Sequence, residues 1–141
     1  MNSEKYPDLL KFQLPVLLWM VLIFTLSSMP GSTFSPIEFP YAHLIAHGLL
    51  FAMLYYLGYR ALRYQSYSRF LSEFSLVTTI FLVILYAAID EYHQSFVPGR
   101  TEDFKDILID TAAAAVVLFV IFLKEKLVRG KRVWEHLDRI H

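Results

Sequence analysis

The residues best suited to chemistry form one short string, Asp90-Glu91-Tyr92-His93-Gln94. Two carboxylates, an imidazole and an amide directly follow an uncharged apolar run over residues 74–89. Such groups can transfer protons or bind cations. Ionisable groups at the end of an apolar helix are costly to bury, so they usually have a partner and a purpose. The string is therefore the first candidate for a functional site.

Two further pairs of ionisable residues have four-residue spacing: His43 with His47, and Asp106 with Asp110. At 3.6 residues per turn, each pair shares one helix face. Asp106 has a structural alternative as a helix cap, because acids are favoured at helix N-termini. Asp110 lies one turn deeper in apolar sequence and is expected to have a specific partner. The histidines have two alternatives: structural hydrogen bonding, which is commoner, and a mixed His/carboxylate metal site with Asp90 and Asp110.

Asp90 poses an electrostatic problem, because a carboxylate near a helix C-terminus opposes the helix dipole. Arg100, His47 or a bound cation would stabilise it. Glu91 and His93 have a simpler alternative, which is to face water at the membrane interface. Arg100 follows a Pro-Gly turn. It either holds phosphate or carboxylate, for which its guanidinium is well shaped, or forms a plain salt bridge with the acids.

Four apolar runs must position these groups, at about 12–29, 41–62, 73–93 and 106–123. The chain is 56 % hydrophobic and 18 % charged, whereas soluble domains are about 25 % charged. A helix needs roughly 20 residues to cross the hydrocarbon layer. We therefore predict an all-α, polytopic membrane protein with a bundle of four transmembrane helices. A soluble apolar helical protein and a cleaved signal peptide over the first run are the weaker alternatives.

The basic residues predict the orientation of this bundle. All of the 13 Lys and Arg residues except Arg100 and Lys105 lie in the N-terminus, the connection after the second run and the C-terminal tail. The positive-inside rule places those segments in the cytoplasm. The predicted organisation is a cytoplasmic N-terminus over 1–11, a membrane domain over 12–123 and a basic cytoplasmic tail over 124–141.

In this orientation the polar groups of all four spans lie at the outer end of the bundle. They are Ser27, Ser28, His43, His47, Asp90, Glu91, His93, Gln94, Asp106 and Asp110. Hydrophilic groups from four separate segments thus converge at one depth in the membrane. This convergence is the main functional signal of the sequence.

The motifs resemble one known family over residues 19–115. The matching features are Ser27-Ser28 near a proline, a histidine early in the second span, and Asp90-Glu91-x-His93-Gln94-x-Phe96-x-Pro98-Gly99-Arg100 with a following Asp106. They resemble the VanZ-like family of small bacterial integral membrane proteins. The resemblance implies a multi-pass protein of the cytoplasmic membrane with envelope-related biology. The name-giving member of the family is linked to low-level teicoplanin resistance. The resemblance implies no particular reaction.

The chain departs from this family pattern at two places. Leu44 stands where a lysine is common, and Asp110 and Ala113 stand where asparagine and glycine are common. The site consequently carries a more negative charge than the family pattern implies. If the family site depends on its charge balance, this member works differently.

Two hypotheses of function follow. The first is a binding protein for an envelope lipid, a cell-wall precursor or a lipoglycopeptide, whose contacts would come from Ser27, Ser28, His43, His47, Asp90, Glu91, Gln94, Arg100, Asp106 and Asp110. The alternative is an outer-leaflet acid/base or metal-assisted enzyme acting on a lipid-linked or peptidoglycan-related substrate, with Asp90, Glu91, His47 and His93 as catalytic candidates. A transporter is a third option, although no inverted repeat is visible. We expect contact with the bilayer and no nucleic-acid partner; the cofactor and homo-oligomerisation stay open.

Overall fold

The computed structural model describes residues 9–33, 41–101 and 103–137, and these are helical with no strand. The long helices are α2 (Leu14–Ser27), α3 (Ala42–Arg63), α5 (Ser75–Gln94) and α6 (Phe104–Leu137). The short element η1 (Leu9–Gln13) precedes α2, and η2 (Gly31–Thr33) and α4 (Arg69–Glu73) lie in the connections. Four helical segments are long and apolar enough to cross a membrane. The prediction of an all-α protein with four membrane-spanning helices is confirmed.

The helix boundaries differ from the predicted spans at two places. The third span was expected to begin at 73, but Glu73 ends the separate short helix α4, whose N-terminus is capped by the Ser68 hydroxyl. The fourth helix begins at Phe104 and continues to Leu137, through most of the segment expected to be a basic tail. Lys, Arg, Glu and Leu are good helix formers, so leaving an apolar environment does not by itself end a helix.

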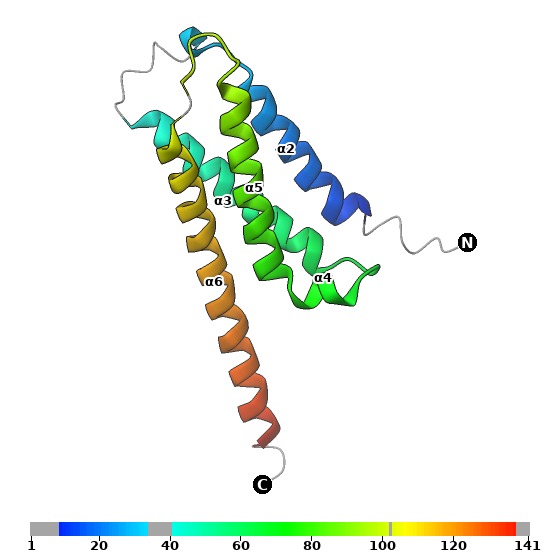
Figure 1. The fold of residues 1–141 in the computed structure, drawn as a ribbon. Helices are drawn as coiled ribbons and strands as arrows, with labels where there is room; N and C mark the ends of the chain where they lie inside the picture. Colours follow the sequence, from blue (N-terminus) through cyan, green and yellow to red (C-terminus); the bar gives the residue numbers. More distant parts are fainter. Residues whose placement is uncertain (1–8, 34–40, 102, 138–141) are drawn as a thin grey trace, which may run out of the picture.

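Helix α3 is the centre of the bundle and packs against α2, α5 and α6 (Figure 1). The core contains Phe51 and Tyr55 of α3, which are fully buried, and small residues let the neighbouring helices approach. A Cβ atom added at Gly48 of α3 would lie 3.7 Å from the Cβ of Ala113 in α6. Small residues at such contacts are typical of helix packing in membranes.

The bundle has two ends of different character. The end of α2, the start of α3, the end of α5 and the start of α6 meet at one end, uppermost in Figure 1, which we call the polar end. The end of α3, together with η1, α4 and the adjoining part of α6, forms the opposite end, which we call the basic end. There Arg60 lies over the Phe12 ring at 5.4 Å, and Arg63 lies 3.8 Å from Glu125.

Candidate functional site

The deepest part of the polar end is a pair between α3 and α6. The Nδ1 atom of His47 lies 3.3 Å from Oδ2 of Asp110, and the Asp110 side chain is 1 % exposed. His47 is thus the specific partner that the sequence analysis expected for Asp110. The second carboxylate oxygen, Oδ1, is the one buried side-chain N or O atom among the described residues with no hydrogen-bond partner. The pair therefore leaves part of the carboxylate unsatisfied.

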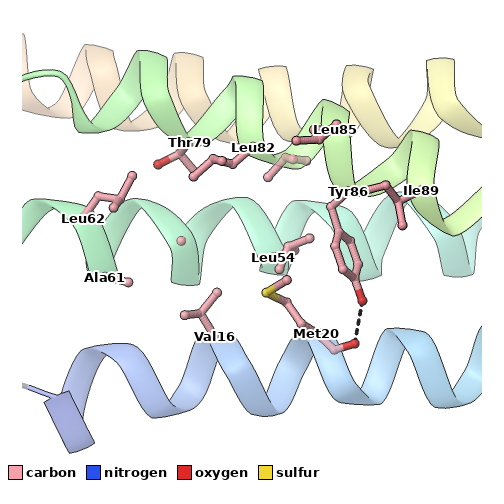
Figure 2. A pocket seen from close by; sticks show the side chains of 12 residues that line it. Val16, Met20, Leu54, Ala61, Leu62, Thr79, Leu82, Leu85, Tyr86 and Ile89 are labelled. Carbon is pink, nitrogen blue, oxygen red and sulfur yellow. Dashed lines mark hydrogen bonds between the residues drawn. The ribbon is translucent and has the colours of Figure 1, made fainter. Parts of the chain in front are cut away.

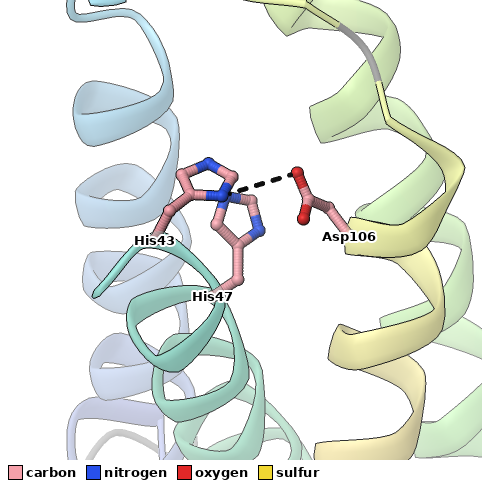
Figure 3. A group of neighbouring side chains, drawn as sticks. All are labelled: His43, His47 and Asp106. Carbon is pink, nitrogen blue, oxygen red and sulfur yellow. Dashed lines mark ion pairs between the residues drawn. The ribbon is translucent and has the colours of Figure 1, made fainter. Parts of the chain in front are cut away.

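One turn nearer the end of the bundle, His43 faces Asp106 (Figure 3). Nδ1 of His43 lies 3.7 Å from Oδ2 of Asp106, and the His43 and His47 rings are 4.4 Å apart. Asp106 is not the helix cap: α6 begins two residues earlier, and Asp103 accepts a hydrogen bond from the backbone N–H of Lys105 at 2.9 Å. The capping role suggested for Asp106 is thus filled by Asp103, and the Asp106 carboxylate faces His43 instead.

Asp90 obtains its stabilisation from neutral donors. Its Oδ2 accepts hydrogen bonds from the Ser27 hydroxyl at 2.9 Å and from the Gln94 amide at 3.0 Å. The dipole argument expected Arg100, His47 or a cation as the stabilising partner, whereas the hydrogen bonds of Asp90 come from Ser27 and Gln94. These neutral donors satisfy the oxygen but carry no positive charge, and His47 acts on Asp90 at longer range. Asp90 is 4 % exposed, so this charge lies inside the bundle.

Glu91 and His93 lie two residues apart in α5 and occupy different environments. Glu91 is buried, and its Oε2 accepts a hydrogen bond from the Asp103 backbone N–H at 3.0 Å. The interpretation of Glu91 as a group facing water is therefore wrong. His93 is partly exposed; its Nε2 lies 2.9 Å from the Ser28 hydroxyl, and its ring stacks on Phe24. His93 and Ser28 thus form an edge contact between α5 and α2.

A pocket of about 380 Å³ opens at the polar end. Four of the predicted site residues line it, namely His43, Gln94, Arg100 and Asp106, together with Gly31, Leu44, Gly99, Thr101 and Asp103. Arg100 folds back toward the bundle, and its Nε donates to the Met29 carbonyl at 3.4 Å. Asp103, which the sequence analysis missed, is both the helix cap and part of the pocket wall.

Two loops hold this pocket in shape through an unusually close backbone contact. The Gly31 N–H donates to the Pro98 carbonyl at 3.2 Å, and a Cβ atom on Gly31 would overlap the backbone carbonyl of Gly99. Gly99 itself has φ +74°, a conformation that favours glycine. The Pro-Gly turn revealed Gly99 in the sequence, whereas nothing local revealed Gly31, because its constraint comes from a distant loop.

The buried charges of the polar end lie within electrostatic range of one another. His47 interacts with Asp90, Asp106 and Asp110, and Glu91 interacts with Asp90, Asp106 and His47. Arg100 interacts with His43 at the pocket. Four buried carboxylates and two imidazoles thus lie together at this end, a set of groups that suits proton transfer or cation binding.

A second cavity, of about 290 Å³, is an apolar groove between α2, α3 and α5 (Figure 2). Val16 and Met20 of α2 face Leu54 and Leu82 across it, and the Tyr86 hydroxyl donates to the Met20 carbonyl at 2.7 Å. The groove extends to Ile89, the residue before Asp90. The apolar groove thus reaches the turn of α5 from which Asp90 projects.

The fold and site together define a class: a small polytopic membrane protein of four helices, with a polar pocket over buried His and carboxylate groups at one end. A family model described as VanZ/LLP1 matches residues 12–125. The chain therefore belongs to the VanZ family, as the motif resemblance implied. No curated protein and no solved structure matches the chain.

Proposed function

We propose that this VanZ-family protein binds a lipid-anchored molecule of the bacterial envelope, with the headgroup in the polar pocket and an acyl chain in the apolar groove. The ligand classes are an envelope lipid, a lipid-linked cell-wall precursor and a lipoglycopeptide such as teicoplanin. One observation carries the proposal: the groove lined by apolar side chains reaches Ile89, which directly precedes the buried Asp90 in α5.

The pocket offers contacts for an anionic, hydroxyl-rich headgroup. Arg100 and His43 are the donors suited to phosphate or carboxylate, and Asp103 and Asp106 can accept from sugar hydroxyls or amines. Cavities with a few polar groups beside apolar walls are the usual form of a small-molecule site. The pocket therefore supports recognition of a headgroup rather than of a hydrocarbon chain alone.

The orientation predicted from the basic residues favours a ligand of the outer leaflet. The positive-inside rule places the basic end in the cytoplasm and the polar end outside. Cysteine labelling can test this placement, because the chain contains no native cysteine. A membrane-impermeant maleimide should label Thr101→Cys in intact cells and should label Ser66→Cys only after the membrane is opened. The reverse pattern would move the site to the cytoplasmic face and exclude an outer-leaflet ligand.

Headgroup binding is tested with purified protein in nanodiscs and a fluorescent lipid-linked cell-wall precursor, with labelled teicoplanin as a second ligand. Arg100→Gln should weaken binding roughly tenfold or more, because it removes a charged donor from the pocket. Arg69→Gln is the matched control, since Arg69 is exposed and pairs with Glu73 at the opposite end. Absence of saturable binding for both ligands, or equal losses in the two variants, would contradict the proposal.

The acyl-chain part is tested by filling the groove. Val16→Phe places a larger side chain in the groove, whereas Val21→Phe on the same helix lies outside it and is 61 % exposed. Val16→Phe should weaken binding of the acylated ligand and leave binding of a water-soluble headgroup unchanged. If both Phe variants bind the acylated ligand as the wild type does, the groove has no part in binding.

A second candidate function is acid/base catalysis on the same ligand class. It is favoured by the His47–Asp110 pair, because a carboxylate that orients an imidazole is a recurring arrangement in enzymes. Incubation with the lipid-linked precursor, followed by mass spectrometry, distinguishes turnover from binding. Turnover that disappears in both Asp90→Asn and Glu91→Gln would favour the enzyme; an unchanged ligand would favour the binding protein.

A further inference from the structure

We infer that His43, His47 and Asp106 form a zinc-binding site with an open coordination position toward the polar pocket. The three side chains come from neighbouring turns of α3 and from the first turn of α6 (Figure 3). The inference goes beyond lipid binding and does not depend on it, because it is argued from the geometry of the three side chains alone. With a metal ion bound, His43 and Asp106 would hold the ion instead of contacting the headgroup directly.

The geometry of the three ligand atoms is close to that of a metal centre. One ligand atom from each residue lies within 4.8 Å of the other two. Two ligand atoms on one tetrahedral zinc ion, with bonds of about 2.1 Å, lie about 3.4 Å apart. A side-chain rotation would have to close the remaining gap, which is at most roughly 1.4 Å. His43, which is 46 % exposed, has the freedom to make this rotation.

The residue types and their spacing are those of a zinc site with a free position. Two histidines four residues apart on one helix face are a recurring zinc-binding arrangement. Sites with two histidines and one carboxylate leave a further position for water or a ligand. His43 and Asp106 also line the pocket. The free position would therefore face the space in which we place the headgroup.

Asp110 supplies an independent reason to expect a cation. Its Oδ2 faces Nδ1 of His47, which leaves Nε2 of that ring as the nitrogen for a metal. A carboxylate behind a metal-bound histidine is a common arrangement, because it fixes the ring and raises its basicity. Oδ1 of Asp110 is buried without a hydrogen-bond partner. Such an oxygen is costly, and a nearby divalent cation would offset part of that cost.

Zinc binding is measured on chelator-treated protein in detergent without added lipid. Calorimetric titration should give one zinc ion per chain. Cobalt in place of zinc should show visible absorption bands characteristic of a low coordination number. Mg²⁺ prefers six oxygen ligands and should not compete.

Substitutions distinguish the proposed zinc ligands from side chains that only lie near the site. His43→Ala should lower zinc affinity roughly 10–100-fold or more, and its partly exposed side chain makes loss of folding a poor explanation. Asp106→Asn, which keeps the shape of the residue, should lower affinity similarly. His93→Ala is the matched control, because His93 contacts Ser28 and Phe24 rather than the other histidines.

Two results would overturn the inference: wild-type protein that binds no stoichiometric zinc, or a His93→Ala variant that loses as much affinity as His43→Ala. Neither result bears on lipid binding, which is measured in a separate titration with chelator present. Failure of the lipid titration alone would leave zinc binding intact and would contradict only the proposed function.

Discussion

The polar end and the basic end of the bundle both bury polar side chains but satisfy them differently. At the basic end, the buried Gln65 donates to the Ser68 carbonyl and accepts from the N–H groups of Tyr67 and Ser68. Each of its polar atoms thus has a structural partner. At the polar end, Asp110 keeps one oxygen without a hydrogen-bond partner, and the hydrogen bonds of Asp90 come only from neutral donors. Polar groups that shape a fold are usually fully satisfied, and this contrast is the reason we propose a binding role for the polar end.

The largest expected effect on stability comes from disrupting the close backbone contact between the two loops of the polar end. Gly31→Ala places a Cβ atom on the Gly99 carbonyl and should lower the free energy of unfolding by about 1–3 kcal/mol, as overpacking does. Because it displaces the loop that carries Arg100, ligand binding should fall as well. Gly48→Ala is the control, because its Cβ would make only ordinary van der Waals contacts with Ile109 and Ala113 of α6. Since alanine favours a helix over glycine, stability should stay equal or rise by up to about 1 kcal/mol. Thermal unfolding in detergent measures both.

A smaller effect is expected at the basic end. Gln65→Ala removes the partners of three backbone groups and should cost about 1–2 kcal/mol of unfolding free energy. Gln65→Glu keeps the acceptor for two N–H groups and should cost less. Neither variant should change ligand or zinc affinity. If Gln65→Ala impaired binding as strongly as a pocket variant, the distinction between the two ends would fail.

Asp110→Asn should have a smaller effect on stability, and in the opposite direction. The substitution keeps an acceptor for His47 and removes a buried, partly unsatisfied charge. With chelator present, the unfolding temperature should therefore be equal to or slightly above that of the wild type, while zinc affinity should fall. A clear loss of stability in chelator would show that the Asp110 charge supports the fold rather than a site.

The smallest effect is expected for Glu73→Gln. Its ion pair with Arg69 is exposed to solvent, with a distance of 2.7 Å between Nε and Oε1. Exposed pairs of this kind contribute less than about 0.5 kcal/mol. Binding and the unfolding temperature should both match the wild type, so a measurable change in either would show that this surface does more than face solvent.

The sequence predicts the spans well because length and apolar character are local properties. Four helix ends at one depth also predict that polar groups of different helices lie near one another, as His47 and Asp110 do. Asp90 instead bonds Ser27 and Gln94. The capping role was misplaced because a single Asp cannot reveal where its helix begins: Asp103, not Asp106, caps α6. The Gly31–Gly99 contact and the neutral partners of Asp90 depend on tertiary approach, which no local pattern contains.

The central claim is that the buried charges of the polar end serve binding rather than folding, and Asp90→Asn tests it most directly. The variant keeps the size of the side chain and an oxygen for Ser27 and Gln94. One sample in nanodiscs gives both the unfolding temperature and the affinity for the fluorescent lipid-linked precursor. We predict an unfolding temperature close to that of the wild type and a loss of affinity. A lower unfolding temperature with unchanged affinity would contradict the account.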